Sequence, residues 1–363
     1  MPGFNIDLII SDYIDDWKLS LNENNNFYMK AWILDNQAKI DEKPLKLVDE
    51  YPTPEPKYGQ VRIKVKYCGI CRTDLHIAEG DLPLHKKPII LGHEIAGVVD
   101  KVGEEVRRIN IGDKVGLSWL YHTCKGCKYC ISGWENYCPY FISTGWDVDG
   151  GFAEYVVAYE EYVFPFNDIP LGLDDLAPMM CPGIASYLAY DLVNPKPGDN
   201  IGVIGFGPTA YYLLKIANYS GIDVYVSTRS KHHMEVAYEN GAKWVGNILK
   251  EDFPKKLDAI ISFPPVGEIV EKALRNLKHG GVLVLAQIAS TRITIKDYSN
   301  IWGRTIKTVH NIRRESAYKM LNLAKKIDLS IEKAIFKFEE LQDAMILVRK
   351  GEVKEMNSVV KID

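Results

Sequence analysis

Four cysteines with the spacing C-x-x-C-x-x-C-x7-C lie in the segment CKGCKYCISGWENYC, at Cys124, Cys127, Cys130 and Cys138. Thiolates at these intervals on a turning loop can surround one zinc ion tetrahedrally. Because all four ligands are protein sulfur, such a site has no position left for a substrate, and the spacing predicts a structural zinc. An iron–sulfur cluster and a zinc-ribbon nucleic-acid module are the alternatives, and the net charge of −4 disfavours the second.

A second group of residues could bind a metal only after folding. Cys68 and Cys71 form a C-x-x-C in the segment YCGICRTDLH, which can be a redox pair, half of a zinc site or buried packing. His93, in LGHEIAG, and Cys181, in MMCPGIASY, lie far along the chain from this pair. Two cysteines and one histidine would make a zinc site whose fourth position is open to a substrate.

The segment GFGPTA has the pattern G-x-G-x-x-A and lies between the apolar run IGVI and the helical pattern PTAYYLLKIANYS. Gly205 allows a tight turn, Gly207 allows the backbone to approach a pyrophosphate, and Ala210 allows close helix–strand packing. The helix that begins at Pro208 and Thr209 would direct its N-terminus at the phosphates. This strand–turn–helix context predicts a dinucleotide site.

The end of the next predicted strand reads VYVSTRSKHH and carries no acidic residue that could bind a ribose 2′-hydroxyl. Ser227, Thr228, Arg229 and Lys231 stand there instead. Hydroxyls and cations suit a 2′-phosphate, so the sequence favours NADP over NAD. The alternative is that Arg229 is a solvated residue at a helix start and that NAD also binds.

Composition sets the broad class of the protein. A chain of 363 residues with 47% apolar and 25% charged residues fits two globular domains. The net charge of −4 gives no reason to expect a nucleic acid or an anionic membrane as partner. The first residues carry several aspartates and lack the basic start of a secretory signal, so we expect a cytoplasmic protein whose cysteines bind metal rather than form disulfides.

The pattern of apolar residues changes along the chain. Residues 29–185 alternate short β-rich runs with Gly and Pro, which predicts a β-rich domain with strands near 61–70, 94–103, 113–120 and 152–164. Residues 186–311 alternate strand and helix patterns, which predicts a doubly wound parallel sheet. Residues 312–363 are expected to return to the first domain, and residues 1–28 to be a disordered extension.

Six motifs together, in this order, resemble the zinc-dependent medium-chain alcohol dehydrogenase family: CGICRTDLH, GHEIAGVV, the four-cysteine segment, DGGFAEY, MMCPGIASY and GFGPTA. The segments TGWDVDGGFAEY and DVYVSTRS are further similar to a cinnamyl-alcohol-dehydrogenase-like microbial branch. The resemblance implies an α/β fold with a GroES-like catalytic domain and a Rossmann cofactor domain. It also implies two zinc ions per chain and a homo-oligomer, either a dimer or a tetramer.

The resemblance assigns the catalytic zinc to Cys71 rather than Cys68, because the family's ligand directly precedes the R-T-D triplet, and it adds His93 and Cys181 as ligands. Glu94 either approaches the zinc or is a structural ion-pair partner.

Residues after Cys71 have roles by the same resemblance. Thr73 and His76 relay the alcohol proton to solvent, a task that suits a hydroxyl and an imidazole. Asp74 orients His93, and Arg72 meets the cofactor pyrophosphate. The alternatives are a backbone hydrogen bond for Thr73, a turn cap for Asp74 and an exposed surface position for His76.

The resemblance places Trp119, Leu120 and Trp146 near the substrate, although ordinary core packing is the alternative for each. Bulky apolar walls favour modest aliphatic or aromatic alcohols and aldehydes. The predicted reaction is hydride transfer between such a substrate and NAD(P). A specialised semialdehyde or aldehyde reductase, and a zinc-stabilised nucleotide-sensing protein without turnover, are the alternatives.

Overall fold

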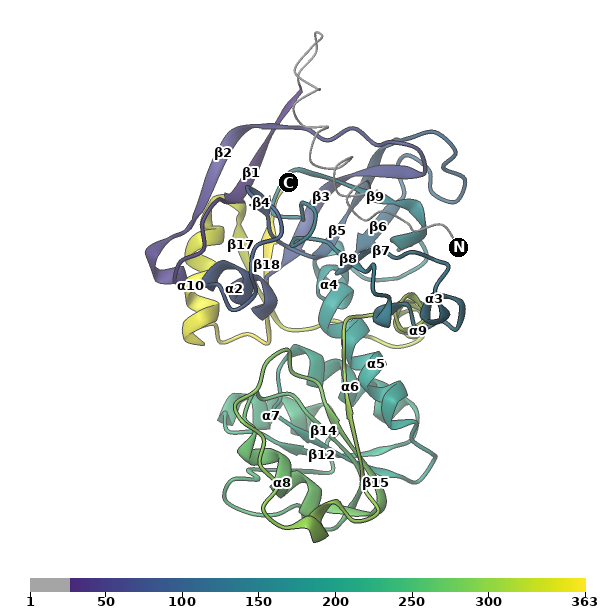
Figure 1. Ribbon diagram of the computed structural model, residues 1–363, viewed down its shortest axis with the longest axis vertical. Helices are drawn as coiled ribbons and strands as arrows, with labels where there is room; N and C mark the ends of the chain where they lie inside the picture. Colours follow the sequence, from purple (N-terminus) through teal and green to yellow (C-terminus); the bar gives the residue numbers. More distant parts are fainter. Residues whose placement is uncertain (1–26) are drawn as a thin grey trace.

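The structure is a computed structural model that describes residues 27–363. Figure 1 shows two lobes, one above the other, with the C-terminus in the upper one. The predicted extension, residues 1–28, lies outside the described residues except for its last two positions, and strand β1 already begins at Tyr28. None of the described helices is long and apolar enough to cross a membrane.

The upper lobe is built on a seven-stranded sheet in which β10, β6, β5, β3, β18 and β17 lie side by side and β9 also pairs with β3. The strands are β3 (Gln60–Gly69), β5 (Glu94–Val102), β6 (Lys114–Leu117), β9 (Tyr155–Tyr159), β10 (Val163–Pro165), β17 (Lys333–Lys337) and β18 (Asn357–Lys361). Strand β18 pairs antiparallel with β3, with Val360 opposite Cys68. The last residues of the chain therefore share a sheet with the strand that leads into Cys71.

Two small sheets complete the β structure of this lobe. One has three strands, in the order β2 (Leu45–Pro52), β1 (Tyr28–Leu34) and β4 (Ile89–Ile90), and the other pairs β7 (Leu120–His122) with β8 (Ile142–Ser143). Strand β4 ends just before His93, and β7 begins just after Trp119. Both small sheets therefore hold segments that enter the candidate site.

The prediction of one continuous strand over residues 152–164 is wrong. The chain forms β9, then a 3₁₀ turn η3 (Glu160–Tyr162), then β10. Strand β9 pairs with β3, whereas β10 pairs with β6 at the sheet's edge. The break lets one apolar run pair with two separate strands, and alternation of side chains along the sequence does not reveal such a change of partner.

Short helices connect the strands of the upper lobe. They are α2 (Arg72–Glu79), α3 (Lys128–Ile131), α4 (Leu173–Pro178), α9 (Arg314–Ala324) and α10 (Leu341–Lys350), with 3₁₀ turns η1 (Ile40–Glu42), η2 (Glu135–Tyr137) and η6 (Phe338–Glu340). Helix α5 (Ile184–Val193) leads from this lobe to the lower one. Between α4 and α5 lies a π-helical turn, η4 (Met179–Gly183). Pro178 and Pro182 lack the N–H of an α-helical hydrogen bond, which accounts for the widened turn here.

The lower lobe holds a six-stranded sheet in the order β13, β12, β11, β14, β15, β16, and every neighbouring pair is parallel. Its strands are β11 (Asn200–Ile204), β12 (Asp223–Ser227), β13 (Trp244–Gly246), β14 (Leu257–Ser262), β15 (Leu277–Leu285) and β16 (Thr305–Thr308). The strand order reverses between β11 and β14, and ligands of doubly wound sheets bind at such a switch point.

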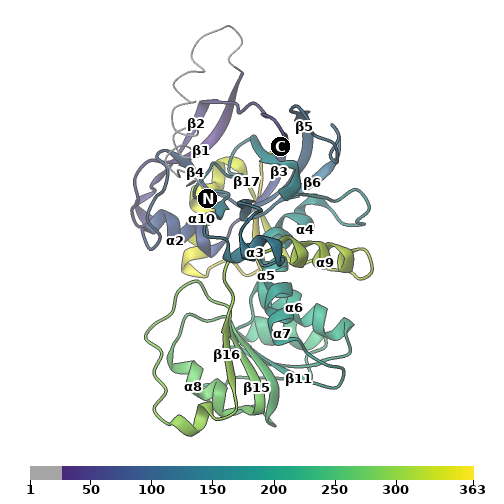
Figure 2. The ribbon, with the colours of Figure 1, turned by 45° about the vertical axis from the view of Figure 1, so that its right-hand side comes forward.

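Helices cover both faces of this sheet. Figure 2 shows α6 (Pro208–Tyr219) and α7 (Lys231–Glu239) on one side and α8 (Glu268–Arg275) on the other, and a 3₁₀ turn η5 (Tyr298–Ile301) precedes β16. Coverage on both faces explains why the central strands are continuous apolar runs rather than alternating ones. One hydrophobic core continues from the upper lobe through α5 and α6 into the lower lobe. The predicted fold class is confirmed.

Candidate active site

Four side chains from three distant segments meet in the fold. The ligand atoms of Cys71, His93, Glu94 and Cys181 all lie within 4.8 Å of one another. Cys71 is the N-cap of α2, His93 and Glu94 lie where β5 begins, and Cys181 lies in the π-turn η4. The structure thus brings together the three predicted ligands, and it places Glu94 among them.

Asp74 fixes the relative position of two of these segments. Its Oδ2 accepts a hydrogen bond from the Cys71 backbone N–H at 2.9 Å, which closes the first turn of α2. Its Oδ1 accepts one from the Gly92 N–H at 3.2 Å. Gly92 has a φ of 94°, a left-handed conformation that favours glycine. Helix α2 and the loop that carries His93 are therefore joined through one buried carboxylate.

His93 is buried, and neither of its ring nitrogens has a hydrogen-bond partner among residues 27–363. Its Nδ1 lies 3.2 Å from Asp74 Oδ1, an ion-pair distance but not hydrogen-bond geometry. Burial favours the neutral ring, yet the charges of Asp74 and Cys71 outweigh it and raise the pKa of His93 well above its usual range. A buried imidazole is seldom left without partners, so this ring is suited to bind a further group.

Glu94, like His93, has a buried polar atom without a hydrogen-bond partner among the described residues. Its side chain is buried, and its Oε2 has no hydrogen-bond partner in the described part of the chain. Burial, and then the negative charge of Cys71, raise the pKa of this carboxyl well above its usual range. A Cβ at Gly69, on the neighbouring strand β3, would collide with the Glu94 carboxylate. The glycine therefore provides the space that lets the carboxylate turn toward the sulfurs.

The two cysteines of the cluster form a close pair. Cys71 Sγ lies 3.9 Å from Cys181 Sγ and 3.5 Å from the Thr73 hydroxyl. The Cys181 thiol is the main cause of a pKa for Cys71 well below its usual range, and the neighbouring His93 charge acts in the same direction. Two sulfurs, an imidazole and a carboxylate within this radius fit a zinc ion with one exchangeable position.

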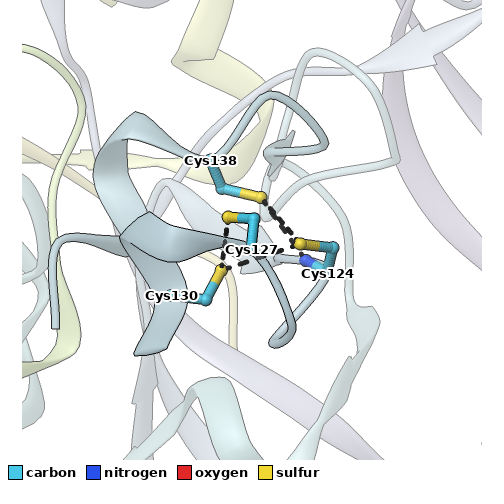
Figure 3. Close-up of side chains that lie close together, drawn as sticks. All are labelled: Cys124, Cys127, Cys130 and Cys138. Carbon is cyan, nitrogen blue, oxygen red and sulfur yellow. Dashed lines mark hydrogen bonds between the residues drawn. The ribbon is translucent and has the colours of Figure 1, made fainter. Parts of the chain in front are cut away.

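The four cysteines of the predicted structural site also come together, as Figure 3 shows. Their sulfurs lie within 4.8 Å of one another, and three pairs are 3.5 to 3.9 Å apart. Cys138 Sγ also accepts backbone N–H groups from Cys124 and Tyr140. A hydrogen bond from the backbone N–H of Cys130 is the main cause that lowers the pKa of Cys127 to about 7. Four convergent sulfurs on a loop fit one tetrahedral zinc.

The remaining residues after Cys71 are divided between the site and the surface. Thr73 is buried beside the cluster, whereas Arg72 is exposed at the first turn of α2. His76 has a side chain 31% exposed, and its Nδ1 lies 2.7 Å from Asp81 Oδ2. Helix α2 thus carries a buried hydroxyl beside the cluster and a partly exposed imidazole near its end.

The glycine segment has the conformation that a dinucleotide site needs. Gly205 has a φ of 79°, and a Cβ there would come within 2.9 Å of Pro264. Gly207 is extended and caps α6, whose first residue is Pro208. A Cβ at Gly207 would meet nothing within 4 Å, so its lack of a side chain keeps open space in front of the helix. Ala210 is buried, and Thr209 is half-buried.

The four residues predicted to contact a 2′-phosphate differ in accessibility. Ser227 is buried at the end of β12, and its hydroxyl accepts the Ile248 N–H at 2.8 Å. Thr228 is also buried, and its N–H donates to Gly246 at 2.9 Å. Arg229 and Lys231 are exposed at the start of α7. The two hydroxyl residues thus hold the loop after β13, and the two cations face outward.

An aromatic wall lies beside His93. The Trp119 ring is 5.0 Å from the His93 ring at 77°, and Trp146 stacks on Trp119 at 5.8 Å. Leu120 is 1% exposed and packs in the core as the first residue of β7. Sequence analysis missed His85, which stacks on Trp146 at 4.0 Å. A histidine in a polar loop carries no motif, so only folding could reveal it.

Comparison with known proteins agrees with this geometry. Residues 57–168 match the alcohol dehydrogenase GroES-like domain. The chain is 37% identical over 305 residues to a probable alcohol dehydrogenase AdhA of Mycobacterium tuberculosis, covering 82% of this chain and 87% of that one. It is 32% identical over 314 residues to cinnamyl alcohol dehydrogenase 7 of Arabidopsis thaliana, covering 81% and 86%.

A solved structure with the same fold is that of a Helicobacter pylori protein described as CAD complexed with NADP(H). It has a TM-score of 0.82 and 25% sequence identity, and the match covers 92% of this chain and 97% of that one. The chain therefore belongs to the zinc-dependent medium-chain alcohol dehydrogenases, a family of NAD(P)-linked oxidoreductases that act on alcohols.

Proposed function

We propose that this oxidoreductase interconverts a small alcohol and its aldehyde or ketone, with zinc bound by Cys71, His93 and Cys181 and with NADP as the preferred cofactor. One observation carries the proposal: a buried histidine without hydrogen-bond partners among the described residues faces two sulfurs that are held by other segments. Zinc at this position would supply a Lewis acid that lowers the pKa of a bound alcohol.

The chain's own residues would complete the reaction. Asp74 holds His93 in place, because it approaches Nδ1 and leaves Nε2 for the metal. Glu94 is a further carboxylate within reach of the metal position. We assign Thr73 and His76 to the movement of the alcohol proton, since the first is buried beside Cys71 and the second reaches solvent.

The proposed cofactor site lies at the N-terminus of α6. Backbone N–H groups that follow Gly207 would face the pyrophosphate, which the helix dipole favours. Arg229 and Lys231 are exposed cations that suit a 2′-phosphate, and we assign Arg72 to the pyrophosphate. A bound NADP would supply or accept the hydride. The described complex of the related Helicobacter pylori structure with NADP(H) supports this choice.

The proposed substrate is an aromatic or modest aliphatic aldehyde, or the matching alcohol. Trp119 is 8% exposed and Trp146 is half-buried, and their stacked rings beside His93 form a wall that suits a planar apolar group. Leu120 lies behind this wall rather than on it, because it is buried in the core.

A second zinc is proposed at the four-cysteine segment, as a structural ion. Its four sulfurs leave no position for substrate, and folding energy is what such a site supplies. The two ligand clusters support a count of two zinc ions per chain.

We also propose that the protein is a homo-oligomer, either a dimer or a tetramer, that uses the edge of the lower sheet. In the part of the chain that the structure describes, β16 pairs only with β15, so its outer edge has unpaired backbone groups. Exposed apolar side chains surround this edge: Ile288, Ile293, Tyr298, Trp302 and Ile306. A second copy of the chain would cover them. The domain bounds 29–185, 186–311 and 312–363 and the cytoplasmic location stay predictions.

The test is nicotinamide absorbance with zinc-replete protein and a panel of aldehydes and alcohols, with NADPH and NADP in one arm and NADH and NAD in the other. Turnover confined to the phosphorylated cofactors is expected. Turnover mainly with NADH would keep the dehydrogenase and overturn the role given to Arg229 and Lys231. Silence in both arms with zinc bound would favour the nucleotide-sensing alternative.

A further inference from the structure

The segment that carries the chain from the lower lobe back to the upper lobe passes close to the aromatic wall. It runs over residues 309–313, between β16 and α9, and Figure 1 shows it as the connection between the lobes. Within it, Asn311 has a φ of 52°, a left-handed conformation that asparagine tolerates better than most residues. Its side chain is half-buried and contacts the upper lobe through two hydrogen bonds, and it also lies beside His310 of its own segment.

Asn311 uses both ends of its amide. Its Oδ1 accepts the indole N–H of Trp119 at 3.1 Å. Its Nδ2 donates to the backbone carbonyl of Asn136 at 3.2 Å and lies 3.1 Å from His310 Nε2. The indole has a single donor, so this hydrogen bond fixes which way the ring plane of Trp119 is turned.

The other partner of Asn311 belongs to the four-cysteine segment. Asn136 lies in η2, two residues before Cys138, and its own side chain donates to the His310 carbonyl at 2.9 Å. Its neighbour Glu135 is buried and accepts both the backbone N–H and the Nε–H of Arg314, at 3.0 and 3.1 Å. The connecting segment is therefore held on the four-cysteine segment from both sides of Asn311.

Trp119 in turn stands edge-on to His93 and stacks on Trp146. A continuous set of contacts thus runs from the structural cysteines, through η2 and Asn311, to the ring beside the candidate zinc ligand. None of the sequence motifs includes Asn311, and the proposed chemistry does not use it.

We propose that Asn311 is a positioning residue for substrate selection: it holds Trp119 against the four-cysteine segment, and it thereby sets the shape of the wall that receives the substrate's apolar group. This inference rests on the proposed function. The binding of an aromatic aldehyde large enough to lie on the indole depends on the orientation of the ring, whereas acetaldehyde is too small for its binding to depend on it.

The test compares Asn311→Gly with wild type and with Asn194→Gly. Glycine keeps the left-handed backbone while removing the side chain, so strain does not confuse the result. Asn194 is a matched control, because it has a φ of 51° and is an exposed residue at the end of α5. The measured quantity is the KM for benzaldehyde relative to the KM for acetaldehyde, with zinc content and Tm in parallel.

For Asn311→Gly we expect this KM ratio to rise about fivefold, the effect of one lost hydrogen bond, while Asn194→Gly leaves it unchanged. Asn311→Asp keeps an acceptor for the indole, so its KM ratio is expected to be close to that of the wild type. In thermal unfolding, Trp119→Phe combined with Asn311→Gly should lower Tm by less than the sum of the two single losses, because both single changes remove the hydrogen bond between Trp119 and Asn311.

An active wild type whose Asn311→Gly variant keeps the KM ratio, or raises both KM values equally, would overturn the positioning role alone. Additive losses of Tm would overturn the contact between the two side chains. A wild-type protein that turns over neither aldehyde would overturn the proposed function and, with it, the selectivity assigned to Asn311.

Discussion

At the scale of single residues, Asp74 determines how the segments of the candidate site are arranged. Asp74 is buried and joins the start of α2 to the Gly92 loop, and it also approaches His93. A carboxylate in this position controls where the imidazole points and how basic its free nitrogen is. The geometry of the candidate metal ligands therefore depends on a carboxylate that does not itself belong to the ligand cluster.

Replacing Asp74 with Asn tests this dependence. The amide keeps the shape but removes the charge near His93 Nδ1, and we expect zinc affinity or turnover to fall by about 10–100-fold. Zinc content by elemental analysis and NADPH-linked aldehyde reduction measure the two effects. Asp343→Asn is the matched control, because Asp343 is a surface residue that pairs with Lys43 at 2.9 Å. Equal zinc content and turnover in both variants would contradict the role of Asp74.

Short sequence motifs predicted which residues would meet, and local geometry explains why. The cysteine spacing places four sulfurs on one loop, and the segment around Gly205 is a turn between strand and helix. Contacts between distant segments, in contrast, have no recognisable motif in the sequence. The Asp74–Gly92 hydrogen bond, the space above Gly69 and the stack of His85 on Trp146 arise only from packing. Residue type alone cannot indicate them.

At the scale of elements, the π-turn η4 brings Cys181 to Cys71 and His93, and the N-terminus of α6 forms the proposed cofactor site. Cys181 lies in η4, between α4 and α5, and two prolines shape that turn. The segment MMCPGIASY predicted a ligand but not the widened turn, because a π-turn depends on how the flanking helices pack. The glycine segment, in contrast, needs only local backbone freedom and was predicted from sequence.

A substitution at Gly207 should affect cofactor binding without affecting the stability of the fold. A Cβ at this position meets nothing within 4 Å, so Gly207→Ala should leave Tm almost unchanged. The added methyl would stand in front of α6, where the proposed pyrophosphate approaches, and we expect NADPH affinity to fall about tenfold or more. Fluorescence titration with NADPH measures the affinity. Unchanged affinity together with unchanged Tm would contradict the proposed position of the cofactor.

The end of the chain is fastened to the central strand β3. Asp363 pairs with Lys64 at 2.9 Å and also contacts Lys66. The hydrogen bonds from Lys64 and Lys66 are the main causes that lower the pKa of Asp363 to about 2. A carboxylate whose pKa falls on folding stabilises the folded state above its unfolded pKa of about 4, and this contribution disappears as the pH falls toward 2.

Asp363→Asn should therefore lower the free energy of unfolding at pH 7 by less than about 1 kcal/mol, because the pair is 44% exposed on the carboxylate side. The difference between wild type and variant should shrink between pH 4 and pH 2. Urea unfolding at several pH values measures it. A difference that grows on acidification would contradict the sign of this linkage.

At the scale of the whole molecule, two lobes are joined by α5, α6 and the returning segment before α9, and one core passes through the junction. The alternation of strand and helix predicted the lower sheet because each βαβ unit is a local pattern. The upper sheet, in which β18 joins β3, has its strands far apart in sequence. Its pairing order could not be read from local patterns.

The exposed edge of the lower sheet allows a test of the proposed oligomer. Ile306 lies on β16 and is 40% exposed. Ile306→Lys should weaken association, because a charge at the centre of an apolar contact must lose its water. Light scattering after gel filtration measures the mass, and Ile111→Lys, at an apolar residue 63% exposed in the other lobe, is the control. A wild-type monomer, or equal masses for both variants, would contradict an interface at β16.

The central claim is that Cys71, His93 and Cys181 bind the zinc at which the alcohol reacts. Its most direct test is the Cys71→Ser variant, with zinc per chain and aldehyde-dependent NADPH oxidation measured on the same sample. With two ligand clusters present, the zinc content should fall from two ions to one per chain, and turnover should be lost while NADPH still binds. Full turnover with one zinc per chain would contradict the claim.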